Sequence, residues 1–527
     1  MTGSAGKLDL ELYRRGTSVY ASLVGASALA APLFAAFGTE AGALRNWQLG
    51  ALLLAAIATV ARAIRGPRAP ETQSAPSSGK PWVPAALGVW MLSGLLLDFA
   101  ALRVNGIDFS VFDWMLESTL RGRFMYSRIY DVPHFGVHQT WWMVPLVGVH
   151  ALWRSPVALL TCNAAVLAAA GLVLWRLVRP LDPTLADLAA IAHATNPWVG
   201  RLLRDGFRPE SFYPLMLYLL VFALWRRRAI WAALAGLGVC LVKEDGPFYA
   251  LAMGSVAALL GTWAPAVAAC SLLAFAGILL LDLEVVRPWQ LGARGPGYLA
   301  FWSEYGDSLP GVVRSVLFHP LRAARDVLSA GWWRVMGPTL FLPLRSATCV
   351  AGIVTGVVML GLSSNPQLHR FEGYYPVPIA SIALCGIVLS SLREGWSRES
   401  RILSSGIALV LFPLFGNGYL RIAWPDAEIR NGVRAVDALV ARAPGPVCVQ
   451  AIALPQLSYS ERVAPLDARC RSEAGSTLVL NPRLDPWPDT RADLEQAIST
   501  ARSVDVLPGG FVVLPPGSAT GWHHPRW

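Results

Sequence analysis

Charged residues are scarce in this sequence. They make up 15% of its 527 residues, against about 25% in an ordinary soluble domain, whereas hydrophobic residues make up 54% and the mean hydropathy is +0.46. This composition excludes an ordinary soluble enzyme and is typical of a protein with many membrane spans. The formal net charge of +10 does not indicate a nucleic-acid partner, because the arginines stand in short clusters between apolar runs.

Several common signals are missing as well. The seven cysteines show no metal-ligand spacing, and five of them lie in apolar segments, where we expect them to act as packing residues. No glycine-rich fingerprint follows an expected strand, which argues against nucleotide binding. We find no internal repeat of the kind that transporters often carry. The N-terminus has no cleavable signal pattern, since Lys7, Arg14 and Arg15 precede an apolar segment long enough to remain as a span.

The apolar runs predict about thirteen spans, each near the roughly 20 residues that a bilayer core requires. Residues 17–38 and 47–64 are the first two, and the basic linker 62–80 places the N-terminus in the cytoplasm by the positive-inside rule. The third span, residues 82–101, then runs outward and delivers residues 105–138 to the extracytoplasmic face. An odd number of spans also places the C-terminus outside.

Three later segments have distinct expectations. Residues 139–153 are apolar and rich in tryptophan but short and interrupted by Pro145, which predicts an interfacial helix. Residues 185–199 are expected to run outward as one span. Another span is expected to run inward and end at Arg345.

From residue 423 onward the composition becomes that of a soluble module. The segments NGVRAVDALVARA and DLEQAISTA predict helices, whereas PVCVQAIAL, STLVLNP and GFVVLPP predict strands. We expect a small extracytoplasmic α/β domain of about 100 residues. Cys448 and Cys470 fall within it, and an oxidising compartment would let them pair. The predicted domains are a two-span hairpin with its linker (1–81), a transmembrane domain with an outer loop at 102–153 (82–422), and this module (423–527).

The polar loop at residues 105–138 predicts an amphipathic helix on the membrane surface. Its apolar residues recur at intervals of 3, 4 and 4 and its charged residues at 4 and 4: Phe109, Phe112, Leu116 and Leu120 in one stripe, and Asp113, Glu117 and Arg121 in another. The charged stripe could be catalytic or a solvated face with i,i+4 pairing. Asp108 precedes the helix in the N-cap position, where an aspartate either satisfies backbone N–H groups or serves chemistry.

Two further groups could bind a ligand. His134 and His138 are four residues apart, a spacing that on a helix presents both imidazoles to one metal ion, but no third ligand is adjacent. Hydrogen bonding or phosphate contact is the alternative. Lys243, Glu244 and Asp245 form a tight turn between two apolar segments, so they are either interfacial anchors or ligands for a phosphate, a cation or a sugar hydroxyl.

A set of short motifs occurs in a fixed order along the chain: DFSVFDW (108–114), RGRFMYS (121–127), His138 ahead of a Trp- and Pro-containing helix, GFRPESFYP (206–214), VKEDGP (242–247) and GYYPVPIA (373–380). In order and spacing this set resembles the bacterial membrane-protein family catalogued as domain of unknown function 2079. That family is similar in layout to the GT-C superfamily of integral membrane glycosyltransferases. The chain departs from the family pattern at three places, with HQTW (138–141) for HFSP, Arg208 for the histidine of FHPE, and Trp114 for a glutamine.

The resemblance implies a GT-C-like, polytopic α-helical protein of the bacterial inner membrane. It implies inverting transfer of a sugar from a polyprenyl-phosphate donor to an extracytoplasmic acceptor, which is a cell-envelope glycan, lipid or protein. The site residues that it implies are a general base, Asp108 with Asp113 second; phosphate-binding groups, Lys243, Arg208, Arg204 and His138; and sugar-binding carboxylates, Glu210, Glu244 and Asp245. Some GT-C enzymes bind a divalent metal, for which His134 and His138 are weak candidates. The alternatives are a transporter or flippase of an amphiphile and a non-catalytic envelope-assembly protein.

Overall fold

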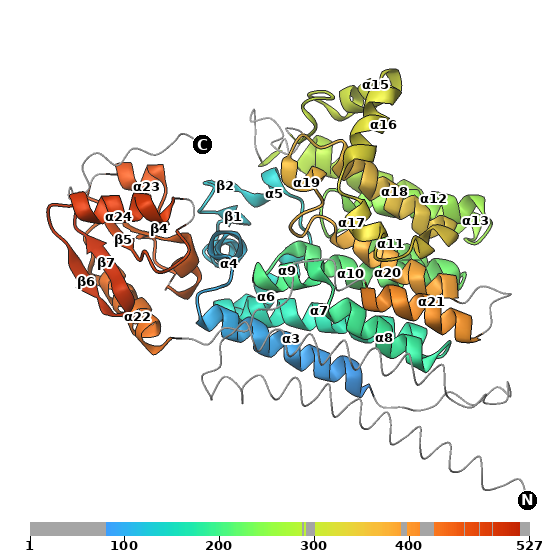
Figure 1. The fold of residues 1–527 in the computed structure, drawn as a ribbon. Helices are drawn as coiled ribbons and strands as arrows, with labels where there is room; N and C mark the ends of the chain where they lie inside the picture. Colours follow the sequence, from blue (N-terminus) through green and yellow to red (C-terminus); the bar gives the residue numbers. More distant parts are fainter. Residues whose placement is uncertain are drawn as a thin grey trace, which may run out of the picture.

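The computed structural model of the protein describes residues 81–286, 289–290, 301–391, 398–411, 426–457, 459–473, 475–486 and 489–516. The two spans expected near the N-terminus and the basic linker after them lie outside these residues. Helices dominate the described chain up to residue 411, and a five-stranded sheet with its helices follows (Figure 1).

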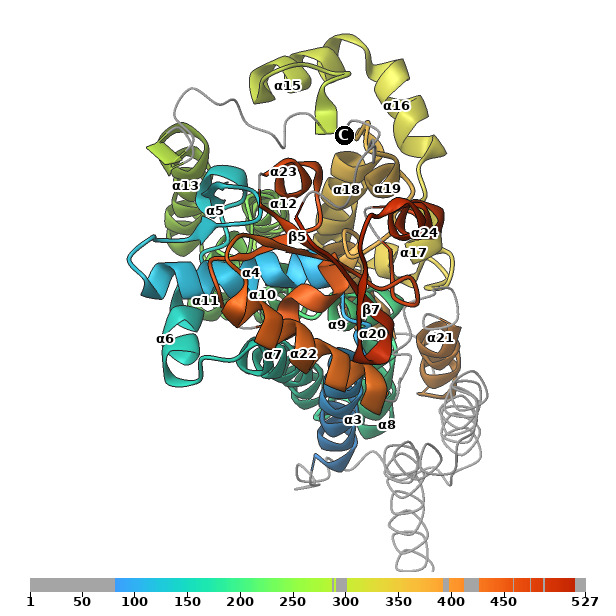
Figure 2. The ribbon, with the colours of Figure 1, turned by 90° about the vertical axis from the view of Figure 1, so that its left-hand side faces the viewer.

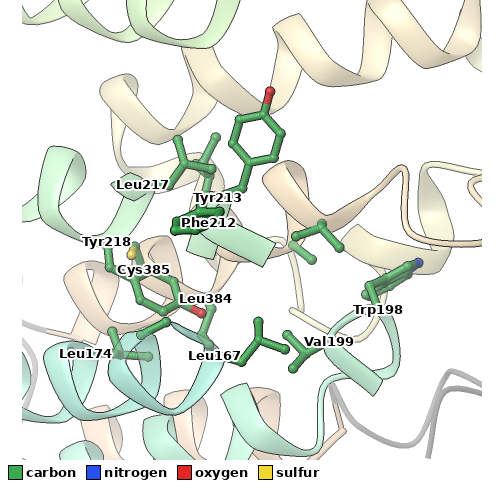
Figure 3. Packing of buried hydrophobic residues seen from close by; sticks show 14 of the residues in the cluster. Leu167, Leu174, Trp198, Val199, Phe212, Tyr213, Leu217, Tyr218, Leu384 and Cys385 are labelled. Carbon is green, nitrogen blue, oxygen red and sulfur yellow. The ribbon is translucent and has the colours of Figure 1, made fainter. Parts of the chain in front are cut away.

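The first of these parts is a bundle of apolar helices, most of which pack on helices near them in sequence (Figure 1). Its principal helices are α3 (Trp82–Ala100), α7 (Pro156–Val178), α8 (Pro183–Ala194), α10 (Phe212–Trp225), α11 (Ala229–Cys240), α12 (Gly246–Leu259), α13 (Pro265–Leu281), α18 (Ala347–Gly361), α20 (Val377–Ser391) and α21 (Arg398–Leu411). Leu167 and Leu174 of α7 meet Tyr218 of α10 and Leu384 of α20 in the buried core of the bundle (Figure 3).

Three helical segments in the described chain are long and apolar enough to cross a membrane: Trp82–Ala100, Pro156–Val178 and Pro265–Val286, the last being α13 continued by the π-helix η2 (Asp282–Val286). Six shorter apolar helices accompany them: Met143–Leu152, Pro209–Trp225, Ala229–Cys240, Gly246–Leu259, Ala347–Gly361 and Val377–Ser391. The total of about thirteen spans stays a prediction.

Two of the expected spans are wrong. The segment 185–199 is broken, because α8 ends at Ala194 and a new helix, α9 (Pro197–Arg204), begins after Asn196, whose side chain accepts a hydrogen bond from Trp198 N. Pro197 cannot donate a backbone hydrogen bond, so it cannot continue α8. The span ending at Arg345 is replaced by two short helices, α17 (Trp333–Met336) and η4 (Leu342–Arg345).

Short elements join the bundle helices on the side where the polar loop lies. They are α4 (Gly106–Leu120), β1 (Tyr126–Ser127), β2 (Val132–Pro133), α5 (His134–Val137), α6 (Met143–Leu152), η1 (Pro209–Ser211), α15 (Leu309–Phe318), α16 (Pro320–Ser329) and α19 (Pro366–His369). The helix expected within 139–153 is confirmed as α6, and with 10 residues it is too short to cross a bilayer core.

The C-terminal part contains a mixed sheet. Its elements are α22 (Ala427–Arg442), β3 (Val447–Val449), η6 (Ala451–Gln456), β4 (Val463–Pro465), α23 (Ala468–Ser472), β5 (Thr477–Leu480), α24 (Arg491–Thr500), β6 (Asp505–Leu507), η7 (Pro508–Gly510) and β7 (Phe511–Leu514). The strand order is β4-β3-β5-β7-β6, with β3 parallel to β4 and β5 and the β7 pairings antiparallel. The expected strands in STLVLNP and GFVVLPP and the two expected helices are confirmed, whereas PVCVQAIAL is a strand only at Val447–Val449 and continues into η6. Cys448 and Cys470 form a disulfide that ties β3 to α23.

Helix α4 lies between the bundle and the C-terminal part in Figure 1, and Figure 2 shows it behind the C-terminal elements. Phe109 and Leu116 belong to the bundle core, whereas Trp114 belongs to the core of the C-terminal part. Of the solvated face with i,i+4 pairing that was one alternative for the charged stripe, the pair between Arg121 and Glu117 is present at 2.8 Å. Asp113 and Glu117 are only 0% and 3% exposed, so they are not solvated. The second face of α4 is covered because η6 packs on it. The local sequence pattern of α4 cannot predict a contact with a segment so much later in the chain.

The contact between α4 and η6 requires glycine at the start of the helix. A Cβ atom added to Gly106 would lie 1.8 Å from the carbonyl oxygen of Ala451, a separation that real Cβ atoms essentially never show. Gln456, at the end of η6, donates a hydrogen bond to the carbonyl of Phe99 in α3. The C-terminal part therefore contacts the chain at Gly106 and at Phe99, just ahead of Asp108.

Candidate functional site

Asp108 lies in the first turn of α4 and not at its N-cap, so the predicted capping position is wrong. The helix begins two residues earlier, because Phe109 N already bonds to Asn105 O at 3.2 Å and Asn105 is the N-cap residue. Asn105 Nδ2 donates a 2.6 Å hydrogen bond to Asp108 Oδ2. The Asp108 carboxylate is thus not used on the backbone N–H groups of its own helix, and it is available for contacts beyond α4.

Arg208 is the main partner of Asp108. Its Nη2 donates to Asp108 Oδ2, and its Nε donates to Asp205 Oδ2 at 2.8 Å. The guanidinium carbon also lies 3.6 Å from the centre of the Tyr374 ring. A guanidinium suits this position because it can bond two carboxylates and stack on an aromatic face at the same time. Arg208 replaces a histidine of the family pattern, and the structure gives it a central place.

Lys243 lies close to Arg208, in the turn between α11 and α12. Its Nζ donates to Glu210 Oε1 at 2.9 Å and lies 5.9 Å from the ring centres of both Tyr374 and Tyr375. Burial acts to lower the pKa of Lys243, but the neighbouring Glu210 carboxylate and other carboxylates outweigh it and raise the pKa well above its usual value. The side chain is therefore a permanently charged cation that is only 12% exposed.

Glu244 and Asp245 follow Lys243 but point to different partners. Glu244 Oε1 lies 2.8 Å from His138 Nδ1, and Glu244 Oε2 accepts from Gln139 N at 3.3 Å. Burial acts against ionisation of Glu244, yet the nearby His138 side chain brings its pKa down to about 2. Asp245 accepts from the hydroxyl of Tyr213, and burial raises its pKa to about 6.

His134 and His138 lie at the two ends of one short helix, α5. His134 begins α5 and is buried, and His138 is the C-cap residue of the same short helix; their ring centres are 5.8 Å apart. Burial lowers the pKa of His134 to about 3, so its imidazole is neutral at pH 7. In the chain that the structure describes, no group of three or more His, Cys, Asp or Glu side chains is arranged to hold a metal ion.

These residues form one group, which we call the Asp108 cluster: Asp108, His138, Asp205, Arg208, Glu210, Lys243, Glu244, Tyr374 and Tyr375. Its members come from α4, the α5 end, the α9–η1 connection, the α11–α12 turn and the segment before α20. The Asp108 and His138 side chains are 27% and 30% exposed, whereas Arg208 is 9% exposed. Solvent therefore reaches the cluster at Asp108 and His138, whereas the cations Arg208 and Lys243 are less exposed.

The sequence did not lead us to assign a role to three members of the cluster. Asp205 was not singled out, and Tyr374 and Tyr375 were noted only as part of the motif GYYPVPIA. The interruption of an apolar run by two adjacent tyrosines was the available signal. Arg204, expected at the phosphate, contributes its backbone carbonyl to Asn105 N at 3.0 Å.

Asp113, the second candidate base, lies in a different group. This Asp113 cluster consists of Asp113, Glu117, His150, Arg154 and Tyr459. The Tyr459 hydroxyl donates to Asp113 Oδ1 at 3.1 Å, and His150 Nε2 lies 3.4 Å from Glu117 Oε2. Arg154 pairs with Glu117. Five residues separate Asp108 from Asp113, which turns their side chains roughly 140° apart on a helix with 3.6 residues per turn.

The Asp113 cluster is sealed by the C-terminal part. Burial raises the pKa of Asp113 to about 7, so the folded protein favours its neutral form. Arg128 donates to the backbone carbonyls of Ser460 and Glu461, and Arg121 donates to that of Tyr459. These bonds hold the 459–461 segment over Asp113, so the structure brings Asp108, and not Asp113, together with the cations.

Comparison with known proteins places the chain in a family. Residues 99–434 match the family described as predicted membrane protein (DUF2079). No curated protein matches the chain. Among solved structures, ArnT from Cupriavidus metallidurans bound to undecaprenyl phosphate aligns with a TM-score of 0.46 and 12% identity, over 84% of this chain and 99% of that one. EmbB, an arabinosyltransferase from Mycobacterium smegmatis, aligns with a TM-score of 0.36 and 16% identity, over 65% and 34% of the two chains.

Both TM-scores are below 0.5, so these likenesses do not decide what the chain does. The family match is of another kind, because it covers well over half of the sequence and includes nearly every residue of the Asp108 cluster's five segments. It also agrees with the apolar composition and the three long apolar helical segments. The chain is a membrane protein and belongs to the DUF2079 family.

Proposed function

We propose that this protein is an integral membrane glycosyltransferase that moves a sugar from a polyprenyl-phosphate donor to an acceptor outside the bacterial inner membrane. The observation that carries the proposal is the Asp108 cluster itself. It holds a partly exposed carboxylate, Asp108, in direct contact with the buried cation Arg208, with a second buried cation, Lys243, close by. The N-terminus would then be cytoplasmic and the C-terminal part extracytoplasmic.

Arg208 and Lys243 would bind the phosphate of the donor. Both cations are now neutralised, Arg208 by Asp108 and Asp205 and Lys243 by Glu210. A phosphate oxygen accepts charge-assisted hydrogen bonds from the same donors, so the incoming donor would take the place of Asp108 on Arg208 Nη2. Tyr374 and Tyr375 keep the cations in place, and Glu210, Glu244 or Asp245 would accept hydrogen bonds from sugar hydroxyls.

Release of Asp108 from Arg208 supplies the base for the transfer step. The carboxylate accepts the proton of the acceptor hydroxyl while the hydroxyl oxygen forms a bond to C1 of the sugar. The bond between C1 and the phosphate oxygen breaks, and the polyprenyl phosphate leaves with the electron pair of that bond. Attack opposite the leaving group inverts the anomeric centre. A divalent cation would add positive charge at the leaving phosphate, and we assign it no residue and no step.

Replacement of Asp108 by Asn tests the proposal. The variant keeps the shape of the side chain but removes its capacity to accept a proton. With the full chain reconstituted in vesicles and a panel of radiolabelled polyprenyl-phosphate sugars, we expect glycan transfer to fall by about 10²-fold or more. Asp113→Asn is the matched control, for which we expect transfer within a few-fold of the unchanged protein.

Two outcomes would contradict the assignment. Full transfer activity in a folded Asp108→Asn protein would show that Asp108 is not the general base. Absence of transfer by the unchanged protein, together with movement of labelled lipid between leaflets that persists in the variant, would instead favour the flippase alternative.

A further inference from the structure

A groove lies on the bundle far from the Asp108 cluster. It has a volume of about 720 Å³ and runs between α12, η4 and α18. Its lining consists of Ala252, Ser255, Val256, Leu344, Arg345, Ala347, Val350, Ala351 and Val354. All but Ser255 and Arg345 are apolar, and Arg345 is exposed. The groove is within the size range of about 300–1,000 Å³ that small-molecule sites have.

The groove lies toward the membrane face opposite to the Asp108 cluster. Helix α12 begins at Gly246, next to Asp245, and Ser255 is nine residues farther along, roughly 13 Å at 1.5 Å per residue. Helix α18 shows the same direction, because its last residue, Gly361, accepts a 3.0 Å bond from His369 Nδ1, in the segment that leads to Tyr374. Arg345 stands ahead of the other end of α18.

The environment of the groove determines what can fill it. Apolar walls between membrane helices do not hold ordered water, which needs polar partners, so the hydrocarbon chain of a lipid is the occupant that matches them. An exposed guanidinium at one end attracts an anionic head group, and basic pockets between membrane helices at the cytoplasmic side are known to bind such groups. The Ser255 hydroxyl offers a further hydrogen bond.

We propose that this groove binds one anionic phospholipid of the leaflet opposite to the Asp108 cluster, with an acyl chain along the α12–α18 seam and its phosphate at Arg345. The inference does not depend on the proposed function. Arg345 supplies the charge-assisted bonds to the phosphate, and the small side chains Ala347 and Ala351 line the path of the acyl chain. The chemistry at Arg345 is shared with polyprenyl phosphate, and the test separates the two lipids.

Native mass spectrometry of the purified full chain tests the inference, with phosphatidylglycerol, phosphatidylethanolamine and undecaprenyl phosphate as added probes. Two variants address the two halves of the site. Arg345→Gln removes the charge, and Ala347→Trp fills the groove from an exposed position that does not disturb the core. Arg228→Gln is the matched control, because Arg228 is an exposed arginine at the start of α11, on the same membrane face and outside the groove.

We expect the unchanged protein to retain one phosphatidylglycerol, and each groove variant to bind it about tenfold more weakly, while the control binds it unchanged. Equal retention by all four proteins would overturn the proposal. Equal retention of phosphatidylethanolamine and phosphatidylglycerol, or preferential retention of undecaprenyl phosphate by the unchanged protein, would overturn the choice of an anionic phospholipid.

Discussion

The Asp108 cluster and the Asp113 cluster lie on different sides of one 15-residue helix and are built from similar residue types. Each has a carboxylate on α4, a histidine from a helix that follows α4 (the end of α5 or α6) and an arginine from another segment. They differ in what covers them. Asp108 is 27% exposed and its arginine is shared with Asp205, whereas Asp113 is 0% exposed beneath Tyr459. Access from outside, and not the set of residue types, therefore distinguishes the candidate reaction site from a structural contact.

Removal of Arg208 should have the largest effect on transfer, because it disrupts the Asp108 cluster. The Asp113 cluster does not contain Arg208 and should stay intact. For Arg208→Ala we expect transfer to fall by about 10²–10³-fold, mainly through loss of phosphate stabilisation in the transition state. Arg208→Lys should recover only a small part, since an ammonium cannot bond two carboxylates and stack on Tyr374 in the same way. Steady-state kinetics with a polyprenyl-phosphate sugar measures both. Arg201→Ala, which removes another partner of Asp205, is the control that should stay close to the unchanged protein.

Gly106→Ala tests whether the C-terminal part positions Asp108. The added methyl group would meet the Ala451 carbonyl at 1.8 Å, so the start of α4 must move. A displacement of about 1 Å at a reacting group can reduce a rate by roughly 10²-fold, and we expect a loss of about 10–100-fold in transfer with a lower melting temperature. Gly148→Ala in α6, where a Cβ would meet nothing within 4 Å, should leave both quantities unchanged. Equal effects of the two substitutions would contradict the positioning role.

The Asp113 cluster should instead appear in the pH dependence of stability. Burial raises the pKa of Asp113 from 3.8 to about 7 in the folded protein, so folding favours its neutral form. Its contribution is fully present below about pH 4 and is lost as the pH rises toward 7, with no further change above. Asp113→Asn, which is neutral at every pH, should therefore reduce the fall in melting temperature between pH 5 and pH 7.5. An unchanged slope would mean that Asp113 is ionised in the folded state.

Tyr459→Phe should give the smallest effect. It removes the hydroxyl that donates to Asp113 Oδ1 at 3.1 Å while the ring remains against His150. Loss of one buried hydrogen bond costs about 1–3 kcal/mol of folding free energy, measurable by chemical denaturation in detergent. We expect transfer activity to stay within a few-fold. A large loss of activity would indicate that the Asp113 cluster takes part in the reaction.

The sequence predicted the residues of the Asp108 cluster better than their surroundings. Lys243 was recognisable as a charge in a turn between two apolar segments, Asp108 as a carboxylate at the start of the polar-loop helix, and Arg208 through the family resemblance. The environment of α4 was not predictable from its own periodicity, because part of its cover, η6 and Tyr459, comes from more than 300 positions later in the chain. The hydrophobic pattern of a helix predicts which of its faces is buried. It does not predict whether another segment of the chain also packs on the polar face.

The errors in the bundle have a local cause. The apolar length of 185–199 suggested a span, although the dipeptide Asn196-Pro197 within it favours a helix end and a new helix start. In the C-terminal part, β4 and β6 were missed because neither three-residue strand is buried along its whole length, whereas β3, which is equally short, is buried throughout. The longer buried strands β5 and β7 were found.

The hydrogen bond between Tyr459 and Asp113 spans 346 positions of sequence, which has a consequence for biosynthesis. At translation rates of about 5–20 residues per second, roughly 17–70 s pass between synthesis of the two residues. During that interval α4 lacks the cover that Tyr459 and η6 provide in the folded protein. The helix that carries Asp108 therefore reaches its final packing only after most of the chain has been inserted, so a ribosome-bound nascent chain that stops before η6 would present α4 to chaperones and proteases.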